Sequence, residues 1–413
     1  MNYKVQKFFA IFILAVLLVV ASSSYYGIQG IDNLAYVVAI GLDAGKDNDI
    51  KLSLQISVPN GGEGGSSSSS QSSSSLVNTI ECSSISTGIA LFNSYLGKEV
   101  NLSHCKVLVI SEELATKGIS EYLYTLTNDI QFRTDSNIII SKCDASAFLE
   151  YSTPELDKVA ARYYEIAPTS SEYTGYTESI TCNEFFTAIN ATTSEPVAIL
   201  GSINTDYTHN TSQDTDSSYT AGETPITGNT SIETMGLAVF NGDKFVGELN
   251  GIESICHLII SNKLKNAQIR IPSPIEELDY IDLYIELKKI TKNSLYLVNS
   301  SPYITSNVKI TARIHSMNQN IDLDDDSLVA NIEKYAENYL KENISSYLYK
   351  TSKELHADID SFGLYTLKYF NYLSDWEDYN WLHHYQDAFF DVNVDVDLNS
   401  SYLLVNTSKE KDA

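Results

Sequence analysis

Two runs of carboxylate residues have spacing that resembles a calcium-binding loop. The first run consists of three alternating aspartates and a later glutamate, namely Asp322, Asp324, Asp326 and Glu333. These residues fall at positions one, three, five and twelve of such a loop, but Ser327 stands where the sharp turn needs glycine. Acidic residues are also favoured at a helix N-terminus by the helix dipole. We therefore favour helix capping over calcium binding here.

The second run is Asp391, Asn393, Asp395 and Asp397. Val396 replaces the glycine of a calcium loop, and Tyr402 replaces its bidentate glutamate. Side chains two positions apart lie on the same face of a strand. This run is therefore predicted to be the solvated face of a strand.

The histidines do not form a recognisable catalytic or metal-binding pattern. His383 and His384 are adjacent, so on a helix they point about 100° apart. His104 precedes Cys105, but neighbouring residues that enter a strand point to opposite faces. The sequence contains no GxSxG, P-loop, GxGxxG or HExxH motif. We predict no catalytic, cofactor-binding or metal-binding residue, no cofactor and no enzymatic activity.

Charge and cysteine content exclude further classes. The formal net charge of −26 disfavours nucleic acid as a partner and disfavours adhesion to anionic lipid. The five cysteines are odd in number, scattered and without a CxxC pair, so they indicate neither a disulfide framework nor a zinc site. They are predicted to fill apolar cores.

The N-terminus carries an export pattern. Lys4 and Lys7 precede fourteen uncharged residues at 8–21, which matches the apolar region of a signal peptide and is shorter than the roughly 20 residues of a typical membrane span. The small residues at 21–24 would suit cleavage. Alternatively, the segment is retained as an anchor, with Tyr25 and Tyr26 in the headgroup zone.

Hydrophobic periodicity predicts the elements of the first half. Residues 35–42 and 51–58 are expected to form a hairpin, and the Gly/Ser-rich stretch 61–75 is expected to be a disordered loop. Helices and strands then alternate up to a strand at 196–203. Residues 204–231 are polar and without apolar periodicity, which indicates a linker or a long loop.

The second half is predicted to contain an antiparallel sheet covered by a helix. The expected elements are a hairpin at 234–249, a helix at 251–264, strands at 280–291, 294–300 and 303–316, an amphipathic helix at 327–355, an aromatic helical stretch at 364–385 and a strand at 391–405. The aromatic stretch could be core or interface, because Tyr and Trp serve both.

These predictions combine into a mixed α/β (α+β) chain in a three-domain arrangement. Mixed or antiparallel sheets, each packed with helices, follow an N-terminal apolar export or anchor segment. The expected divisions are 1–26 for the signal peptide or anchor, 27–203 for an N-terminal α/β region of two subdomains, 204–231 for the linker, 232–406 for a C-terminal α+β domain and 407–413 for a charged tail.

A collinear set of segments resembles the Ger(x)C family, the C subunits of spore nutrient germinant receptors. The segments are IDNLAYVVAIGLD (31–43), LSLQISVP (52–59), SHCKVLVISEELATKGI (103–119), DIQFRTDSNIIIS (129–141), GLAVFNGDKFVGEL (236–249), DSFG (360–363) and FFDVNVDVDL (389–398). The resemblance implies an exported protein of three domains without catalytic activity. It also implies a place on the outer face of the spore inner membrane, beside an A subunit and a transporter-like, multi-spanning B subunit.

One departure from the family pattern concerns lipidation. Family members usually carry a lipobox cysteine followed by Trp and an acidic residue, but Tyr25, Tyr26 and Gly27 occupy those positions here. Tyr25 cannot take a thioether-linked lipid, so no lipidation site is predicted and the retained anchor gains weight. The alternative function is an exported solute-binding or adhesion protein of similar fold. An extracellular hydrolase is a third and weaker reading.

Overall fold

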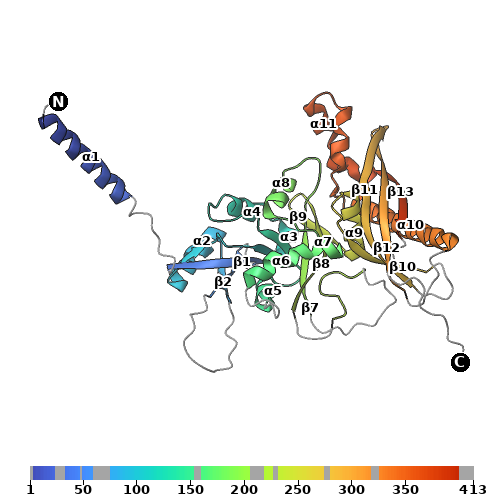
Figure 1. Ribbon diagram of the computed structural model, residues 1–413, viewed down its shortest axis with the longest axis horizontal. Helices are drawn as coiled ribbons and strands as arrows, with labels where there is room; N and C mark the ends of the chain where they lie inside the picture. The colour runs from blue at the N-terminus through green and yellow to red at the C-terminus, as the bar shows by residue number, and fades with distance from the viewer. Residues whose placement is uncertain are drawn as a thin grey trace, which may run out of the picture.

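The structure is a computed structural model that describes residues 3–23, 33–46, 49–58, 75–152, 160–204, 218–226, 231–273, 280–317 and 325–399. Helix α1 (Tyr3–Ser23) contains the predicted apolar segment, and its described apolar side chains, including Phe8, Phe12 and Leu17, are exposed (Figure 1). Within the described part of the chain, we find no helix that combines the length and the apolar character needed to cross a membrane.

The first sheet has nine strands and a mixed topology. Its strands are β1 (Leu34–Ala44), β2 (Ile50–Ser57), β3 (Ser75–Cys82), β4 (Glu99–Asn101), β5 (Val107–Ser111), β6 (Asn137–Ser141), β7 (Val197–Asn204), β8 (Ser231–Asn241) and β9 (Lys244–Leu249). The order is β3-β2-β1-β5-β6-β7-β8-β9, with β4 paired to β1. The central strands β1, β5, β6 and β7 run parallel, and antiparallel pairs flank them.

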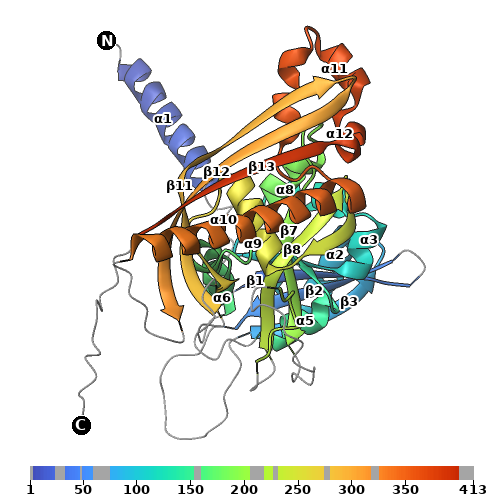
Figure 2. The same cartoon turned by 90° about the vertical axis from the view of Figure 1, so that its right-hand side faces the viewer.

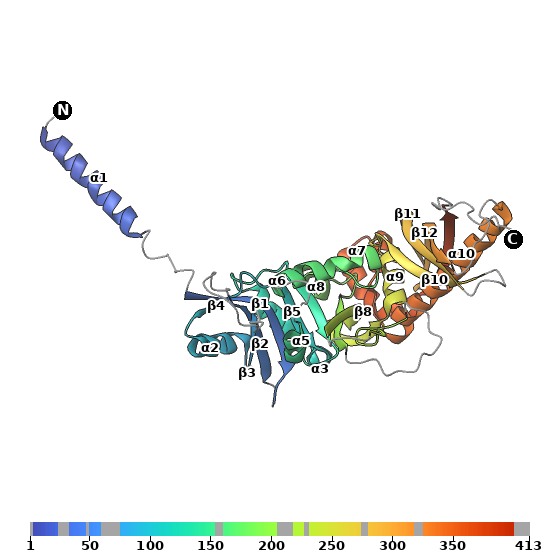
Figure 3. The same cartoon turned by 60° about the horizontal axis from the view of Figure 1, so that its bottom comes forward.

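Helices cover both faces of this sheet (Figure 3). One face buries apolar residues against α2 (Ile85–Leu96), α3 (Glu112–Lys117), α4 (Ser120–Thr127) and α8 (Cys182–Ile189). The other face packs on α5 (Ala145–Tyr151) and α6 (Ala160–Ile166), and α7 (Ser171–Thr174) follows. Burial on both faces explains why β5 and β6 are almost continuously apolar rather than alternating.

The hairpin β8–β9 extends the first sheet although the predicted polar linker precedes it in sequence. β8 pairs antiparallel with β7 from Ser231 to Val239. Gly236 of β8 has φ +91°, and a β-carbon there would lie 2.2 Å from the carbonyl oxygen of Leu249. Only glycine therefore fits at this position of the strand. One sheet therefore continues across 204–231.

Helix α9 (Gly251–Ile260) lies between the two sheets and is almost entirely buried (Figure 1). Asn250 and Glu253 form a capping box at its start. The second sheet has the order β10-β11-β12-β13. Its strands are β10 (Ala267–Pro272), β11 (Tyr280–Val298), β12 (Ser301–Met317) and β13 (Phe389–Leu398). All pairs are antiparallel except β12 with β13, which are parallel.

Helix α10 (Asp326–Tyr349) crosses the second sheet and continues into a π-helical turn at Lys350–Glu354 (Figure 2). It buries Ile332, Leu340 and Ile344, and it packs along β13. The chain then forms 3-10 turns at Phe362–Tyr365 and Leu367–Tyr369, the short helices α11 (Leu373–Tyr379) and α12 (Trp381–His384), and a last 3-10 turn at Tyr385–Asp387.

The mixed α+β fold class is confirmed, with two sheets packed with helices in the described residues. Both predicted hairpins are present. Two element predictions were wrong. The strands expected at 280–291 and 294–300 are one strand, β11, whose register shifts near Lys289 and Lys292 absorb the polar interruption. The helix expected at 364–385 is broken into short turns, with Asn380 in the left-handed region at φ +49°.

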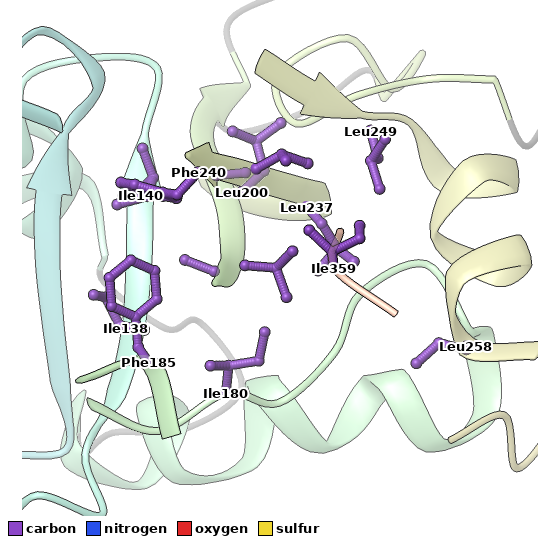
Figure 4. Close-up of a cluster of buried hydrophobic side chains, with 14 of the residues drawn as sticks. Ile138, Ile140, Ile180, Phe185, Leu200, Leu237, Phe240, Leu249, Leu258 and Ile359 are labelled. Carbon is purple, nitrogen blue, oxygen red and sulfur yellow. The ribbon is translucent and has the colours of Figure 1, made fainter. Parts of the chain in front are cut away.

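Apolar side chains form a continuous core from the first sheet to the second half of the chain (Figure 4). The labelled residues come from β6, β7, β8, β9, α8 and the connection before it, α9 and the segment before the 3-10 turn, namely Ile138, Ile140, Ile180, Phe185, Leu200, Leu237, Phe240, Leu249, Leu258 and Ile359. The predicted division into domains stays a prediction, but the two sheets share this core.

Candidate functional site

The second carboxylate run lies on a strand as predicted, and the described part of the first run lies on or beside the start of α10. Asp325 accepts a hydrogen bond from Ser327 N at 2.9 Å and begins α10, whereas Asp322 and Asp324 lie outside the described residues. Glu333 accepts from Leu398 N at 2.8 Å. In the second run, the side chains point to the exposed face of β13, and Asp397 pairs with Lys288 at 2.5 Å. In the described ranges, no three His, Cys, Asp or Glu side chains gather closely enough to hold a metal ion.

The rings of His104, His383 and His384 pack against neighbouring rings. The His104 ring contacts Tyr36 edge-on at 4.6 Å, and the buried Cys105 thiol donates to Val107 O, so the two side chains do not form a dyad. Burial raises the pKa of Cys105 to about 12. His384 stacks on Tyr379 at 4.2 Å, and the ring of His383 is turned 89° from it. Tyr25 lies outside the described residues.

The most concentrated set of buried ionisable groups lies around His257 on α9. Its Nδ1 is 2.9 Å from Asp360 Oδ1, and its Nε2 is 2.9 Å from Glu178 Oε2. The Tyr347 hydroxyl of α10 donates to Asp360 Oδ2 at 2.7 Å. Lys263 pairs with the other oxygen of Glu178. We call these five residues the His257 cluster. They come from the connection before α8, from α9 and the residues just after it, from α10 and from the DSFG segment.

Opposite charges meet at His257 and Glu178 in the His257 cluster. Burial alone would lower the pKa of His257, but hydrogen bonds and charge attraction from Asp360 and Glu178 outweigh it and raise that pKa to about 9. Burial also opposes ionisation of Glu178, but His257 and Lys263 lower its pKa to about 2. At neutral pH His257 and Glu178 therefore carry opposite charges in direct contact, which is the condition under which buried charge is tolerated.

A second buried carboxylate, Asp358, organises the DSFG segment. It accepts backbone hydrogen bonds from Phe362 at 3.1 Å and Gly363 at 2.9 Å, and the Trp381 indole donates to it at 2.8 Å. Burial raises the pKa of Asp358 to about 7, and these donors offset part of that rise. A β-carbon at Gly363 would lie 2.4 Å from Thr193 O, so glycine permits close approach to the first half.

Hydrogen bonds tie the residues just before DSFG to the first half of the chain. Glu195 N donates to Asp358 O at 2.7 Å, and the Asn241 side chain donates to His356 O at 3.0 Å. The Glu195 carboxyl accepts from Gly242 N at 2.7 Å, and burial raises its pKa to about 7. Residues 356–358, just before DSFG, are thus bonded to the end of β8 and to the segment before β7, and Asp360 of DSFG contacts His257 of α9.

This arrangement suits a structural joint. A general acid or base must come within hydrogen-bond reach of its substrate, but His257 is fully buried and both of its ring nitrogens face carboxylates. Neither His257 nor Glu178 belongs to a local sequence pattern, because Glu178 lies 79 residues and Asp360 lies 103 residues from His257 along the chain. Asp360 was noticed only as part of DSFG.

Comparisons with known proteins agree on one kind of protein. The model described as spore germination protein N-terminal domain matches residues 28–203, and that described as spore germination B3/GerAC like, C-terminal, matches residues 235–402. Spore germination protein KC of Bacillus subtilis (strain 168) is 24% identical over 376 residues, which is 88% of each chain. The crystal structure of the GerBC protein covers 87% of this chain and 96% of its own, with 14% identity and a TM-score of 0.48.

Proposed function

Because the chain belongs to the Ger(x)C family of spore germination proteins, we propose that it is the non-catalytic C subunit of a spore nutrient germinant receptor. The observation that carries this proposal is the match of both halves, in order, to the two family models. The burial of His257 between two acidic side chains supports a structural rather than a catalytic role.

The proposed partners are the A subunit and the transporter-like, multi-spanning B subunit of the same receptor. A tagged full-length chain, extracted from spore membranes in detergent, should co-purify with both. Spores that lack the chain should lose germination in response to at least one nutrient, and the restored gene should return it. Wild-type germination of the deleted strain on every nutrient tested, together with purification of the chain alone, would contradict the proposal.

The proposed location is the outer face of the spore inner membrane, with attachment through the N-terminal segment. The exposed apolar side chains of α1 and the export pattern support this placement. Tyr25 at the lipobox position favours attachment without lipid. Membrane fractionation with intact-mass analysis should yield a full-length, unlipidated, membrane-bound chain. A soluble chain that starts near residue 22 would exclude the tether.

A solute-binding role is the second candidate, and one observation favours it. A surface groove of about 830 Å³ lies beside α3 and α4, and its lining includes Asp49, Lys117, Tyr122 and Asp243. Small-molecule sites are concave and combine apolar and aromatic side chains with a few polar or charged groups. Calorimetric binding of a nutrient by the purified chain without any other subunit would favour this role over the proposed one.

A further inference from the structure

The segment after DSFG presents apolar side chains to solvent instead of burying them. Five large residues within ten positions are exposed, and we call them the distal patch: Leu364, Leu367, Tyr369, Tyr372 and Leu373. Tyr372 and Leu373 are 71% and 66% exposed. Single exposed apolar residues are ordinary, whereas several in one short segment are typical of an interaction surface.

The distal patch is held on a rigid support. Tyr369 donates from its hydroxyl to Leu295 O of β11 at 2.7 Å. Trp376 is buried, and its indole donates to Thr366 Oγ1 at 2.7 Å. Figures 1 and 2 both place α11 beside the ends of β11 and β12. A preorganised aromatic and aliphatic surface loses little conformational entropy on binding.

The charges around the patch select among possible occupants. Helix α11 begins within the patch and carries the exposed carboxylates Asp375, Glu377 and Asp378. The exposed Lys368 lies 5.0 Å from the centroid of the Tyr369 ring, so three carboxylates and one cation leave the surroundings acidic. These carboxylates would be repelled by an anionic lipid surface and by a second copy of this chain, whose net charge is −26. A protein surface with an apolar centre and a basic rim complements both features.

We propose that the distal patch is the docking surface for a protein partner of that chemistry, a receptor subunit with an apolar centre and a basic rim. This inference rests on the proposed function, because it assigns the contact by which the chain joins the receptor. Tyr and Leu side chains that become buried at the centre of an interface carry a large share of its affinity.

The test is co-purification of the tagged full-length chain from spore membranes. The double variant Tyr372→Ser with Leu373→Ser should reduce the recovered partner about tenfold or more, since each truncation removes apolar contact area. Tyr95→Ser with Ile130→Ser is the matched control, because both residues are exposed and lie elsewhere. It should recover the partner as the wild type does. Thermal unfolding of all three chains should coincide.

A charge variant separates a protein partner from lipid. Glu377→Lys with Asp378→Lys should weaken partner recovery about tenfold by repelling the basic rim. A lipid contact would instead strengthen membrane retention. Recovery of the partner by both variants at the control level, or stronger membrane retention of the lysine variant with the partner still present, would overturn the inference. If the wild-type chain recovers no partner, the proposed function itself fails.

Discussion

His257 is buried between Glu178 and Asp360, which contact opposite sides of its ring and raise its pKa to about 9. The protonated form of His257 in the folded chain depends on these two contacts. Replacing it by an uncharged residue leaves Glu178 and Asp360 without their shared partner. We expect His257→Gln to lower the free energy of unfolding by about 3 kcal/mol or more. Urea denaturation measures this, with the exposed His383→Gln as the control, which should change stability by less than about 0.5 kcal/mol. Equal effects of the two substitutions would contradict the role given to the cluster.

The contribution of His257 should depend on pH in a defined direction. Its folded pKa of about 9 exceeds the ordinary 6.5, so its stabilisation is fully present below pH 6.5 and is lost as pH rises through about 9. The difference in unfolding free energy between the wild type and His257→Gln should therefore shrink by about 3 kcal/mol between pH 6 and pH 10. A difference that stays constant over this range would mean that His257 is neutral in the folded chain.

At the level of elements, short-range residue patterns correctly predicted the two hairpins. The hairpins around residues 43–49 and 241–244 were found because alternating apolar residues flank turn residues. The length of β11 was missed, because Lys292 and Asn293 interrupt the alternation and only the pairing with β12 restores it. The His257 cluster could not be predicted, because its residues come from distant segments that meet only through tertiary packing.

Strand β13 is an edge of the second sheet, and α10 covers part of that edge. Glu333 accepts from Leu398 N at 2.8 Å, and Glu337 accepts from Val396 N at 3.3 Å. Carboxylates at these amides block pairing with a strand from another molecule.

We expect Glu333→Ala with Glu337→Ala to cause concentration-dependent self-association, because two edge amides lose their acceptors. Sedimentation velocity over a range of concentrations measures it. Glu342→Ala is the control, since Glu342 is exposed on the same helix. If the double variant sediments like this control, the two glutamates do not protect the edge.

At the scale of the whole molecule, the two sheets share one buried core and one ionic cluster. Apolar side chains from β6 to Leu258 and Ile359 belong to one buried cluster (Figure 4). The exposed aromatic residues of 364–373 and the buried Trp376, Trp381 and Tyr385 also show that the tyrosine-rich segment is core on one side and open on the other. The halves are therefore expected to unfold together rather than as independent domains.

The close contact between Gly363 and Thr193 O provides a test of that cooperativity. Gly363→Ala would place a methyl group 2.4 Å from this oxygen and 2.6 Å from Trp381, which forces the DSFG segment away from the first sheet. Scanning calorimetry should show one transition for the wild type and two for this variant, because the first sheet keeps its own helices while the joint is lost. Gly97→Ala is the control: its φ of +64° makes alanine strained by about 1 kcal/mol, but nothing lies within 4 Å of the added carbon. The Gly97→Ala variant should unfold at a lower temperature than the wild type but in a single transition. Two transitions in the wild type would show that the shared core does not couple the halves.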